Sequence, residues 1–217
     1  RLVPGASRSS ARPASSRAGD PLIQQPAAAP LARYVVQVVP TREDAAARRI
    51  AALGGDAVQA CFPLRRQMLR RKGGVWSYAE EPLLPGYLFL ASDDPDLVNR
   101  ILRRSTWPDV MLGADGCLST LADDEAALVR ALADEEGVVR SSRGRIVEGE
   151  LMVDAGPLAG LEGLVRRVDR HHRAAWIDPS RAGEVILGAD PARSGAEAVL
   201  PAGAHGLKVG LEVVSKS

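Results

Sequence analysis

Short apolar runs alternate with amphipathic stretches over the N-terminal half of the chain, a pattern that predicts strands and helices in turn. Residues 34–39 are β-branched and predict a strand. Residues 42–53 predict a helix that Thr41 caps, with Leu53 on its apolar face. The full predicted order is strand 34–39, helix 42–53, strand 58–62, a hairpin at Gly73-Gly74, strand 87–91, a helix from Pro95 and helix 123–134. This order predicts an α+β sandwich built on an antiparallel sheet.

The pattern changes after residue 137. Short apolar segments separated by Gly, Pro and Asp predict a small β-barrel, and a Ser-, Arg- and Gly-rich linker precedes it. We expect residues 190–206 to form a surface loop. The predicted strands of the barrel are 146–153, 163–169, 174–177, 184–187 and 207–214.

The first 33 residues are rich in Pro, Ala, Ser and Arg and contain few large apolar side chains. We expect a disordered tail, because such a segment buries too little surface to offset its ordering entropy. An Arg- and Ser-rich, acid-poor start is also typical of an organelle transit peptide, which is the alternative. The expected organisation is a tail over 1–33, a first domain over 34–136, a linker over 137–145 and a β-barrel domain over 146–217.

The formal net charge of +1 is the sum of three uneven parts. Counting Lys and Arg against Asp and Glu, residues 1–33 carry +4, residues 34–136 carry −4 and residues 137–217 carry +1. A globally basic nucleic-acid-binding protein does not fit this distribution, so such a role must depend on local clusters. No apolar run reaches the roughly 18 residues of a membrane helix, so we expect no membrane partner.

Enzymatic chemistry finds little support in the sequence. It contains no phosphate-binding loop, dinucleotide-binding fingerprint or nucleophile elbow. His171 and His172 are adjacent, so on a strand they would point to opposite faces and would not share a metal. Cys61 and Cys117 are far apart and form no paired ligand pattern, and Cys61 is expected to be a buried apolar residue. We expect no catalytic residue, no metal and no cofactor.

Three basic clusters are candidates for nucleic-acid binding, because guanidinium groups bind phosphate. For the cluster at the predicted hairpin, a solvated charged edge is an equal alternative, although Trp76 and Tyr78 nearby offer rings on which bases stack. For the cluster at the end of the second helix, a favourable interaction with the helix dipole is the leading alternative. The third cluster favours nucleic acid or an acidic protein. The clusters are Arg65, Arg66, Arg70, Arg71 and Lys72; Arg100, Arg103 and Arg104; and Arg166, Arg167, Arg170 and Arg173 with His171 and His172.

Motifs in both halves resemble one family. Tyr34-Val35-Val36-Gln37-Val38, Phe62-Pro63 and Pro82-Leu83-Leu84-Pro85-Gly86-Tyr87-Leu88-Phe89 resemble the N-terminal (NGN) domain of NusG-type transcription elongation factors. Gly156-Pro157-Leu158-Ala159-Gly160-Leu161-Glu162-Gly163 and Val168-Asp169-Arg170 resemble a KOW motif. The resemblance extends from residue 34 to about 214. It implies an NGN-type α/β sandwich with an antiparallel sheet, followed by a small SH3-like β-barrel (KOW).

The resemblance also implies partners. In this family an apolar face of the NGN domain docks onto the clamp helices of the largest subunit of RNA polymerase, and this binding favours the closed, processive clamp. Nascent RNA and non-template DNA are the implied nucleic-acid contacts of a monomer in the bacterial cytoplasm, near the nucleoid. Some positions of the docking face are expected to be plain core. The positions that match it are Tyr34, Phe62, Leu84, Pro85, Tyr87 and Phe89.

Details of the motifs are most similar to the LoaP-type specialised antitermination paralogues, which act on particular operons and read a nascent RNA hairpin. Leu161 stands where the general NusG factor usually carries a Phe that engages Rho or a ribosomal protein. Residues 105–110 depart from the family sequence near the non-template strand, and residues 178–206 are longer than in a usual KOW barrel. Two alternatives remain: a general NusG-type elongation factor that couples polymerase to Rho or the ribosome, and a KOW-type RNA-binding or ribosome-associated protein.

Overall fold

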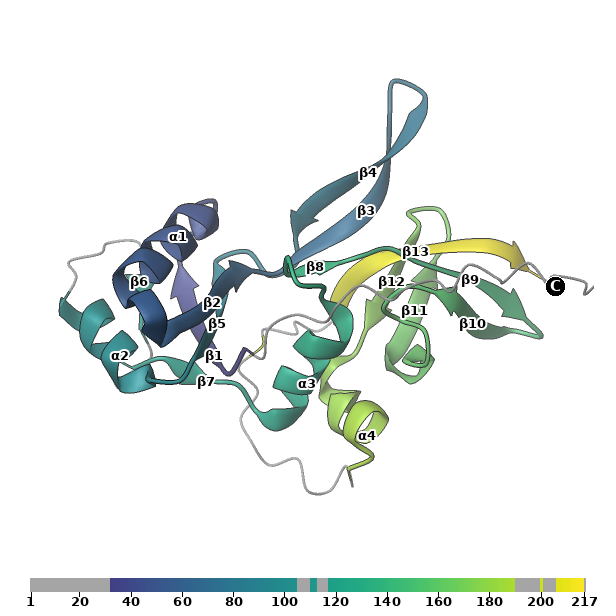
Figure 1. Cartoon of the computed structure of the whole chain (residues 1–217). Helices are drawn as coiled ribbons and strands as arrows, with labels where there is room; N and C mark the ends of the chain where they lie inside the picture. Colours follow the sequence, from purple (N-terminus) through teal and green to yellow (C-terminus); the bar gives the residue numbers. More distant parts are fainter. Residues whose placement is uncertain (1–31, 105–109, 113–116, 190–199, 201–205, 217) are drawn as a thin grey trace, which may run out of the picture.

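The computed structural model describes residues 32–104, 110–112, 117–189, 200 and 206–216. These residues form a helix-covered antiparallel sheet at one end, a curled sheet at the other and a long hairpin between them (Figure 1). The predicted α+β fold class is therefore confirmed. The predicted tail lies almost wholly outside the described residues, as do most of the predicted loop over 190–206 and most of segment 105–110.

The N-terminal half contains three α-helices and eight strands among its described residues. In chain order its elements are β1 (Tyr34–Val38), α1 (Glu43–Gly54), η1 (Gly55–Ala57), β2 (Val58–Pro63), β3 (Arg65–Lys72), β4 (Val75–Pro82), β5 (Tyr87–Ser92), α2 (Pro95–Arg104), β6 (Val110–Met111), β7 (Ser119–Thr120), α3 (Asp123–Leu132) and β8 (Val138–Val139). The C-terminal half continues with β9 (Ser142–Val147), β10 (Glu150–Ala155), η2 (Glu162–Leu164), β11 (Val165–Asp169), β12 (Ala174–Ile177), η3 (Pro179–Arg181), α4 (Ala182–Leu187) and β13 (Leu207–Lys216).

The N-terminal sheet has the strand order β2-β5-β1-β6, with β7 also pairing with β1, and all its pairs are antiparallel. Because side chains alternate along a strand, its residues divide between two faces. Val36 and Leu88 lie on one face and pack with α1 and α2. Val35 and Phe89 lie on the other and pack with α3 and with apolar residues of the C-terminal half. We call these the α1/α2 face and the α3 face.

The first helix differs in two details from the sequence prediction. Thr41 has a φ of 73° and does not cap the helix; α1 begins after Arg42, which makes no side-chain capping bond. Leu53 is 49% exposed instead of inward. The apolar buried side of the helix is formed by Ala46, Ala47 and Ile50.

The C-terminal sheet has the strand order β10-β9-β13-β12-β11 and curls into a half-barrel, which fits the predicted KOW unit. The predicted strand 146–153 is wrong, because Glu148 and Gly149 have positive φ and turn the chain between β9 and β10. The predicted strand 184–187 is also wrong, since these residues belong to helix α4. This short helix packs on α3, and that distant contact has no local sequence signal.

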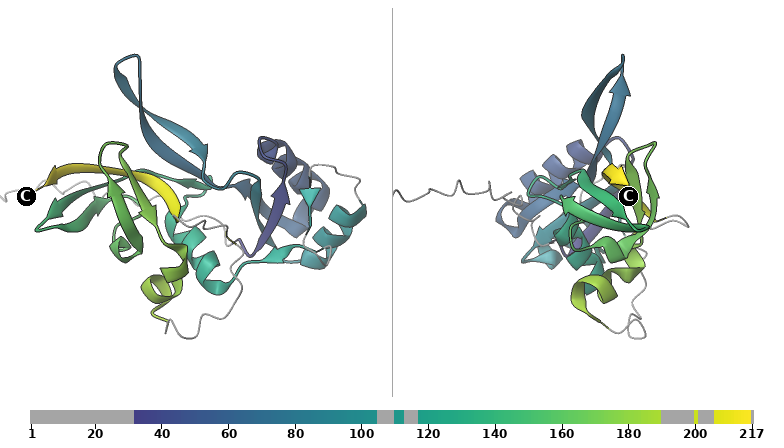
Figure 2. Two further views of the ribbon diagram at one scale, coloured as in Figure 1. Left: turned by 180° about the vertical axis from the view of Figure 1, so that it is seen from behind. Right: turned by 90° about the vertical axis from the view of Figure 1, so that its right-hand side faces the viewer.

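Strands β3 and β4 form the predicted hairpin, which projects away from both sheets (Figure 2). Gly73 and Gly74 both have positive φ at its two-residue turn, a conformation that glycine adopts without strain. The other edge of β3 pairs in parallel with β8. Residues 137–145, predicted as a linker, thus contain β8 and the beginning of β9. The predicted domain boundaries themselves stay predictions.

Candidate functional site

A tight turn sets the geometry of the Pro-Gly-Tyr motif. The Tyr87 N–H donates to the Leu84 carbonyl at 3.3 Å, and Gly86 has a φ of 80°, as a type II turn requires at that position. A Cβ on Gly86 would lie 2.9 Å from the Val38 carbonyl oxygen, so no larger residue fits there without a shift. The Gly86 N–H donates to Oε1 of the buried Glu43 at 2.8 Å. The turn therefore has one fixed conformation, with Pro85 exposed at its tip.

Five of the predicted polymerase-binding residues lie in or beside this turn, namely Phe62, Leu84, Pro85, Tyr87 and Phe89. The rings of Phe62 and Phe89 stack with centroids 6.3 Å apart. The Tyr87 hydroxyl, at the half-buried end of the same face, accepts a hydrogen bond from Nε2 of Gln37 at 3.0 Å. Leu84 and Phe89 are buried, whereas Phe62 and Tyr87 are half-buried. The accessible part of this group is thus an edge formed by Phe62, Pro85 and Tyr87, which we call the Pro85 edge.

Tyr34 does not join this group. It is opposite Leu90 in the register, and both residues belong to the α1/α2 face. Its side chain packs against the core of that face. The structure therefore places Tyr34 on the face of the sheet opposite to Phe62 and Phe89.

The α3 face beside the Pro85 edge is covered from far along the sequence. Leu84 and α3 residue Leu128 line a small apolar pocket together with Leu200 and Leu207 from the C-terminal half. The Leu200 N–H donates to Oε1 of the buried Glu125 at 2.7 Å. Glu125 also caps its own helix, since its Oε2 accepts from the Ala122 N–H at 3.0 Å. This polar contact fixes the C-terminal cover to the start of α3.

The basic cluster on the hairpin divides into two groups. Three arginines near its base bind carboxylates or carbonyls: Arg65 pairs with Asp44 at 2.6 Å, Arg70 forms two hydrogen bonds to Glu81 at 2.7 and 2.8 Å, and Arg66 donates to the Lys208 carbonyl at 2.9 Å. Arg71 and Lys72, near the tip, are exposed, and Arg71 donates only to the nearby Gly74 carbonyl among the contacts resolved. The tip therefore carries the accessible part of the cluster.

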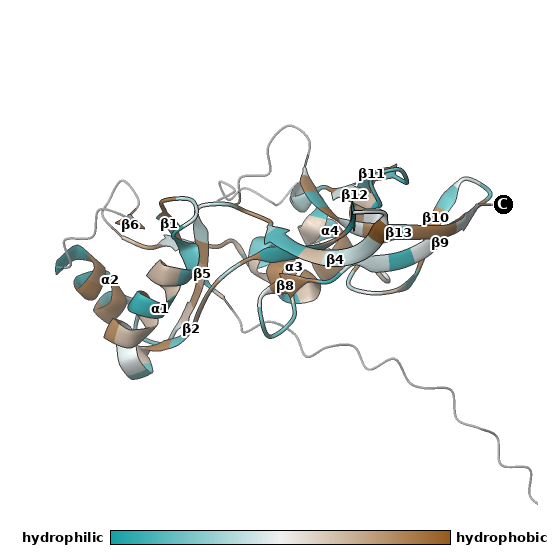
Figure 3. Ribbon diagram, turned by 90° about the horizontal axis from the view of Figure 1, so that it is seen from above, coloured by the Kyte–Doolittle hydropathy of each residue, from teal (hydrophilic) through white to brown (hydrophobic). Residues whose placement is uncertain are grey.

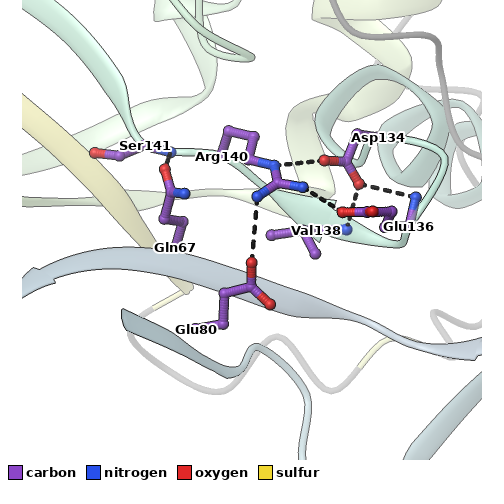
Figure 4. A network of polar contacts seen from close by, with 7 residues as sticks. All are labelled: Gln67, Glu80, Asp134, Glu136, Val138, Arg140 and Ser141. Atoms are coloured by element: carbon purple, nitrogen blue, oxygen red, sulfur yellow. Dashed lines mark hydrogen bonds and ion pairs between the residues drawn. The ribbon is translucent and has the colours of Figure 1, made fainter. Parts of the chain in front are cut away.

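Arg140, which the sequence did not single out, connects three elements at the base of the hairpin (Figure 4). It contacts Asp134 at 2.5 Å, Glu136 at 2.5 Å and Glu80 of β4 at 3.2 Å. Burial would lower the pKa of its guanidinium, but the hydrogen bond and charge of Asp134, with Glu136 and Glu80, raise the pKa above the ordinary value. Asp134 is buried and also accepts the N–H groups of Glu136 and Val138. Glu136 and Asp134 lie only four and six residues before Arg140, but the contact with Glu80, 60 residues away on β4, has no local sequence signal.

The second basic cluster lies apart from the hairpin. Arg100, Arg103 and Arg104 are exposed on α2, at the far end of the N-terminal sheet (Figure 1). Arg103 donates to Sγ of Cys117 at 2.8 Å. These residues therefore do not form one surface with the other two clusters.

The third cluster surrounds the turn between β11 and β12. Arg166, Arg167 and Arg170 are all exposed, and Arg166 pairs with Asp178 at 3.5 Å. Asp169 holds the turn, because its carboxylate accepts the His172 N–H at 3.0 Å and contacts His172 Nδ1 at 2.8 Å. These two hydrogen bonds, the backbone one first, lower the pKa of Asp169 to about 2. The two neighbouring histidines thus belong to a basic turn.

Other chemistry is limited in the part of the chain that the structure describes. Burial raises the pKa of the Cys61 thiol to about 12, so it stays protonated and apolar. Within the described ranges, no group of three or more His, Cys, Asp or Glu side chains is placed to hold a metal ion. Across those same ranges, none of the helices combines the length and the apolar character that crossing a membrane demands.

Comparison with known proteins relates residues 32–132 to a family. Residues 32–132 match the family model of NusG, described as transcription termination factor nusG. No curated protein matches the chain. The matched range contains the N-terminal sheet, the hairpin, the Pro85 edge and α3. Residues 32–132 therefore form an NGN domain of the NusG type, and members of that family are non-enzymatic transcription factors that bind RNA polymerase.

Proposed function

We propose that the protein is a specialised NusG-type antitermination factor. It binds the clamp helices of the largest subunit of RNA polymerase and promotes readthrough of terminators in particular operons, with contacts to nascent RNA. The proposed setting is the bacterial cytoplasm, where a monomer acts near the nucleoid. The single observation that carries the polymerase contact is the Pro85 edge, because it lies within the NusG-matched range and its position is fixed by the Gly86 turn.

The edge has the properties of a docking site. Phe62 and Tyr87 are aromatic residues that are only half-buried, and Pro85 is exposed at the tip of the turn. Aromatic residues at such positions dominate the energetics of many protein interfaces. Binding to the closed clamp more tightly than to the open one would shift polymerase towards processive elongation without covalent chemistry.

The specialised role is supported by the loop before η2. Leu161 is half-buried and packs against the larger core cluster. A general factor would need an accessible aromatic side chain here to engage Rho or a ribosomal protein. The position therefore favours the specialised factor over a general elongation factor, the first alternative. The second alternative, a KOW-type RNA-binding or ribosome-associated protein, leaves the Pro85 edge unexplained.

Reconstituted transcription tests this function. RNA polymerase is run on templates that carry candidate leader sequences upstream of an intrinsic terminator, with and without the full-length protein. We expect more readthrough product and retention of the protein on immobilised polymerase. Unchanged termination on every leader, together with no retention, would refute the proposal.

A matched pair of variants locates the contact. Tyr87→Asp places a charge on the Pro85 edge, whereas Leu53→Asp places one on the exposed side of α1, away from the edge. We expect Tyr87→Asp alone to abolish polymerase retention while both variants keep their circular dichroism spectra. Equal loss in both variants would remove the edge from the interface.

A further inference from the structure

One residue joins the hairpin to the C-terminal sheet through an aromatic ring. The Arg173 guanidinium lies over the Trp76 ring, 4.1 Å from its centroid, and also pairs with Glu212 on β13. Arg173 has a φ of 48°, a left-handed conformation that non-glycine residues rarely adopt. The turn between β11 and β12 therefore holds Arg173 in a particular direction, against the ring of β4.

A second aromatic–cation group lies on the same side of the C-terminal sheet. Trp176 has Arg167 at 5.1 Å and Lys208 at 4.8 Å from its ring centroid. The strand register places these three residues opposite one another on β11, β12 and β13, so they share one face. Glu212 lies on that face as well, four residues after Lys208 on β13. Both aromatic–cation groups thus lie on the same face of the C-terminal sheet.

A close backbone contact holds the hairpin on this surface. The Lys208 carbonyl accepts a hydrogen bond from Arg66, and Gln67 accepts one through Oε1 from the Ser141 N–H at 3.3 Å. A Cβ on Gly210 would lie only 2.3 Å from the Gln67 carbonyl oxygen, so this approach requires glycine. Seen from above, β4 lies between the N-terminal sheet and β13 (Figure 3). The hairpin and strand β13 therefore hold their side chains at fixed positions relative to one another.

The hairpin side of this surface carries exposed rings and cations. Trp76 is 43% and Tyr78 55% exposed, unusual values for large aromatic side chains. They lie two residues apart on β4 and so share one face, opposite Arg71 and Leu69 in the register. Arg173 covers one side of the Trp76 ring, and Tyr78 and the exposed Arg71 continue the row. Rings beside cations are the combination that binds stacked bases and their phosphates.

We propose that this surface is a composite binding site for single-stranded nucleic acid. Unpaired bases stack on Trp76 and Tyr78, and phosphates contact Arg71 and the Arg167–Lys208 group. Base-paired nucleic acid fits less well, because its bases are already stacked and show no free ring face. This site rests on the nucleic-acid contact of the proposed function. It specifies that contact further, because the ligand is single-stranded and both halves of the chain contribute to the site.

Fluorescence anisotropy with the full-length protein tests the site. The probes are a labelled 12-nucleotide RNA of mixed sequence without self-pairing, the DNA of the same sequence and the corresponding RNA duplex. We expect at least one single strand to bind about tenfold or more tightly than the duplex at equal salt. Equal or tighter binding of the duplex, or no binding of either single strand, would overturn the proposal.

Substitutions of the rings give the decisive readout. Trp76→Ala and Tyr78→Ala should each weaken single-strand binding about 5- to 150-fold, the range for the loss of one stacked base. Trp76→Phe keeps a ring and should lose much less. These side chains are exposed, so all three variants should fold. Wild-type affinity in both alanine variants would refute stacking.

A pair of glycine variants tests the composite geometry. Gly210→Ala should displace the hairpin and weaken binding while every ring and cation remains. Gly183→Ala is the control, because its Cβ would meet only ordinary contacts at 3.6 Å and beyond. If Gly210→Ala folds and binds as the wild type does, the site does not require both halves. If Gly210→Ala does not fold, Arg173→Ala replaces it, with the same expected loss.

Polymerase retention and oligonucleotide binding test the proposed function and the composite site separately. Retention on polymerase without oligonucleotide binding would refute the composite site and leave the polymerase contact intact. Tight binding of single-stranded DNA with weak binding of RNA would support the site and contradict the RNA contact of the proposed function.

Discussion

The two faces of the N-terminal sheet are covered in different ways. The α1/α2 face is covered by helices that immediately follow or precede its strands, and its core contains Val36, Leu88 and Ile50. The α3 face is covered by α3 and by residues more than 100 positions further along the chain, including Leu200 and Leu207. The first face is built from local sequence, whereas the second depends on how the C-terminal half docks. The Pro85 edge lies at the border of the second face.

Removing the largest fully buried side chain of the α3 face should have the largest effect. Phe89 is fully buried and stacks on Phe62. We expect Phe89→Ala to lower the free energy of unfolding by about 3–5 kcal/mol, measured by urea denaturation. A loss below about 1 kcal/mol would show that this face is not core.

The polar connection at the base of the hairpin should contribute less. Arg140→Ala leaves the carboxylate of the buried Asp134 without its guanidinium, so we expect a loss of about 1–3 kcal/mol in the free energy of unfolding. Arg145→Ala is the matched control, since Arg145 forms a more exposed pair with Asp154 and should cost at most about 1 kcal/mol. Equal losses in the two variants would mean that Arg140 is an ordinary surface residue.

The division of the hairpin cluster predicts different salt dependences for two adjacent arginines. Arg71 is exposed at the tip, so Arg71→Ala should reduce the slope of log affinity against log salt by about 1 for single-stranded nucleic acid. Arg70 is held by Glu81, so Arg70→Ala should change the slope less. The reverse order would contradict the assignment of the tip as the accessible part.

The smallest expected effect is local to the turn between β11 and β12. The Asp169 carboxyl should titrate near pH 2 in a carbon-detected NMR experiment. Because its folded pKa lies below the ordinary value, its contribution to stability is present above about pH 4 and is lost as the pH falls through about 2. In His172→Ala the backbone N–H remains, so the pKa should rise only part of the way; a complete return to the ordinary value would show that the side chain is the main cause.

The contrast between the α1/α2 face, which local elements cover, and the α3 face, which distant residues cover, also explains how much of the fold could be predicted from the sequence. The N-terminal elements follow from periodicity and turn chemistry, as at Gly73-Gly74 and the Pro85-Gly86 turn. The sequence predicts a strand over residues 184–187, but these residues form a helix that packs on α3. Local patterns do not contain such a contact.

The candidate site shows the same limit. Phe62, Leu84, Pro85, Tyr87 and Phe89 come together in the structure, whereas Tyr34 lies on the α1/α2 face because side chains alternate along β1. Charge density alone did not distinguish Arg70 from Arg71, since the partner Glu81 lies on another strand. Arg140 and Arg173 have roles that depend on the docking of the two halves, so their positions in the sequence gave no signal for those roles.

Site-specific photocrosslinking to RNA polymerase tests the central claim most directly. A photoreactive amino acid is placed at Pro85, on the proposed docking edge, or at Leu53, exposed on α1. The account predicts a crosslink from position 85 to the clamp helices of the largest subunit and none from position 53. Crosslinks from position 53 alone, or none from position 85 in a protein that polymerase still retains, would contradict it.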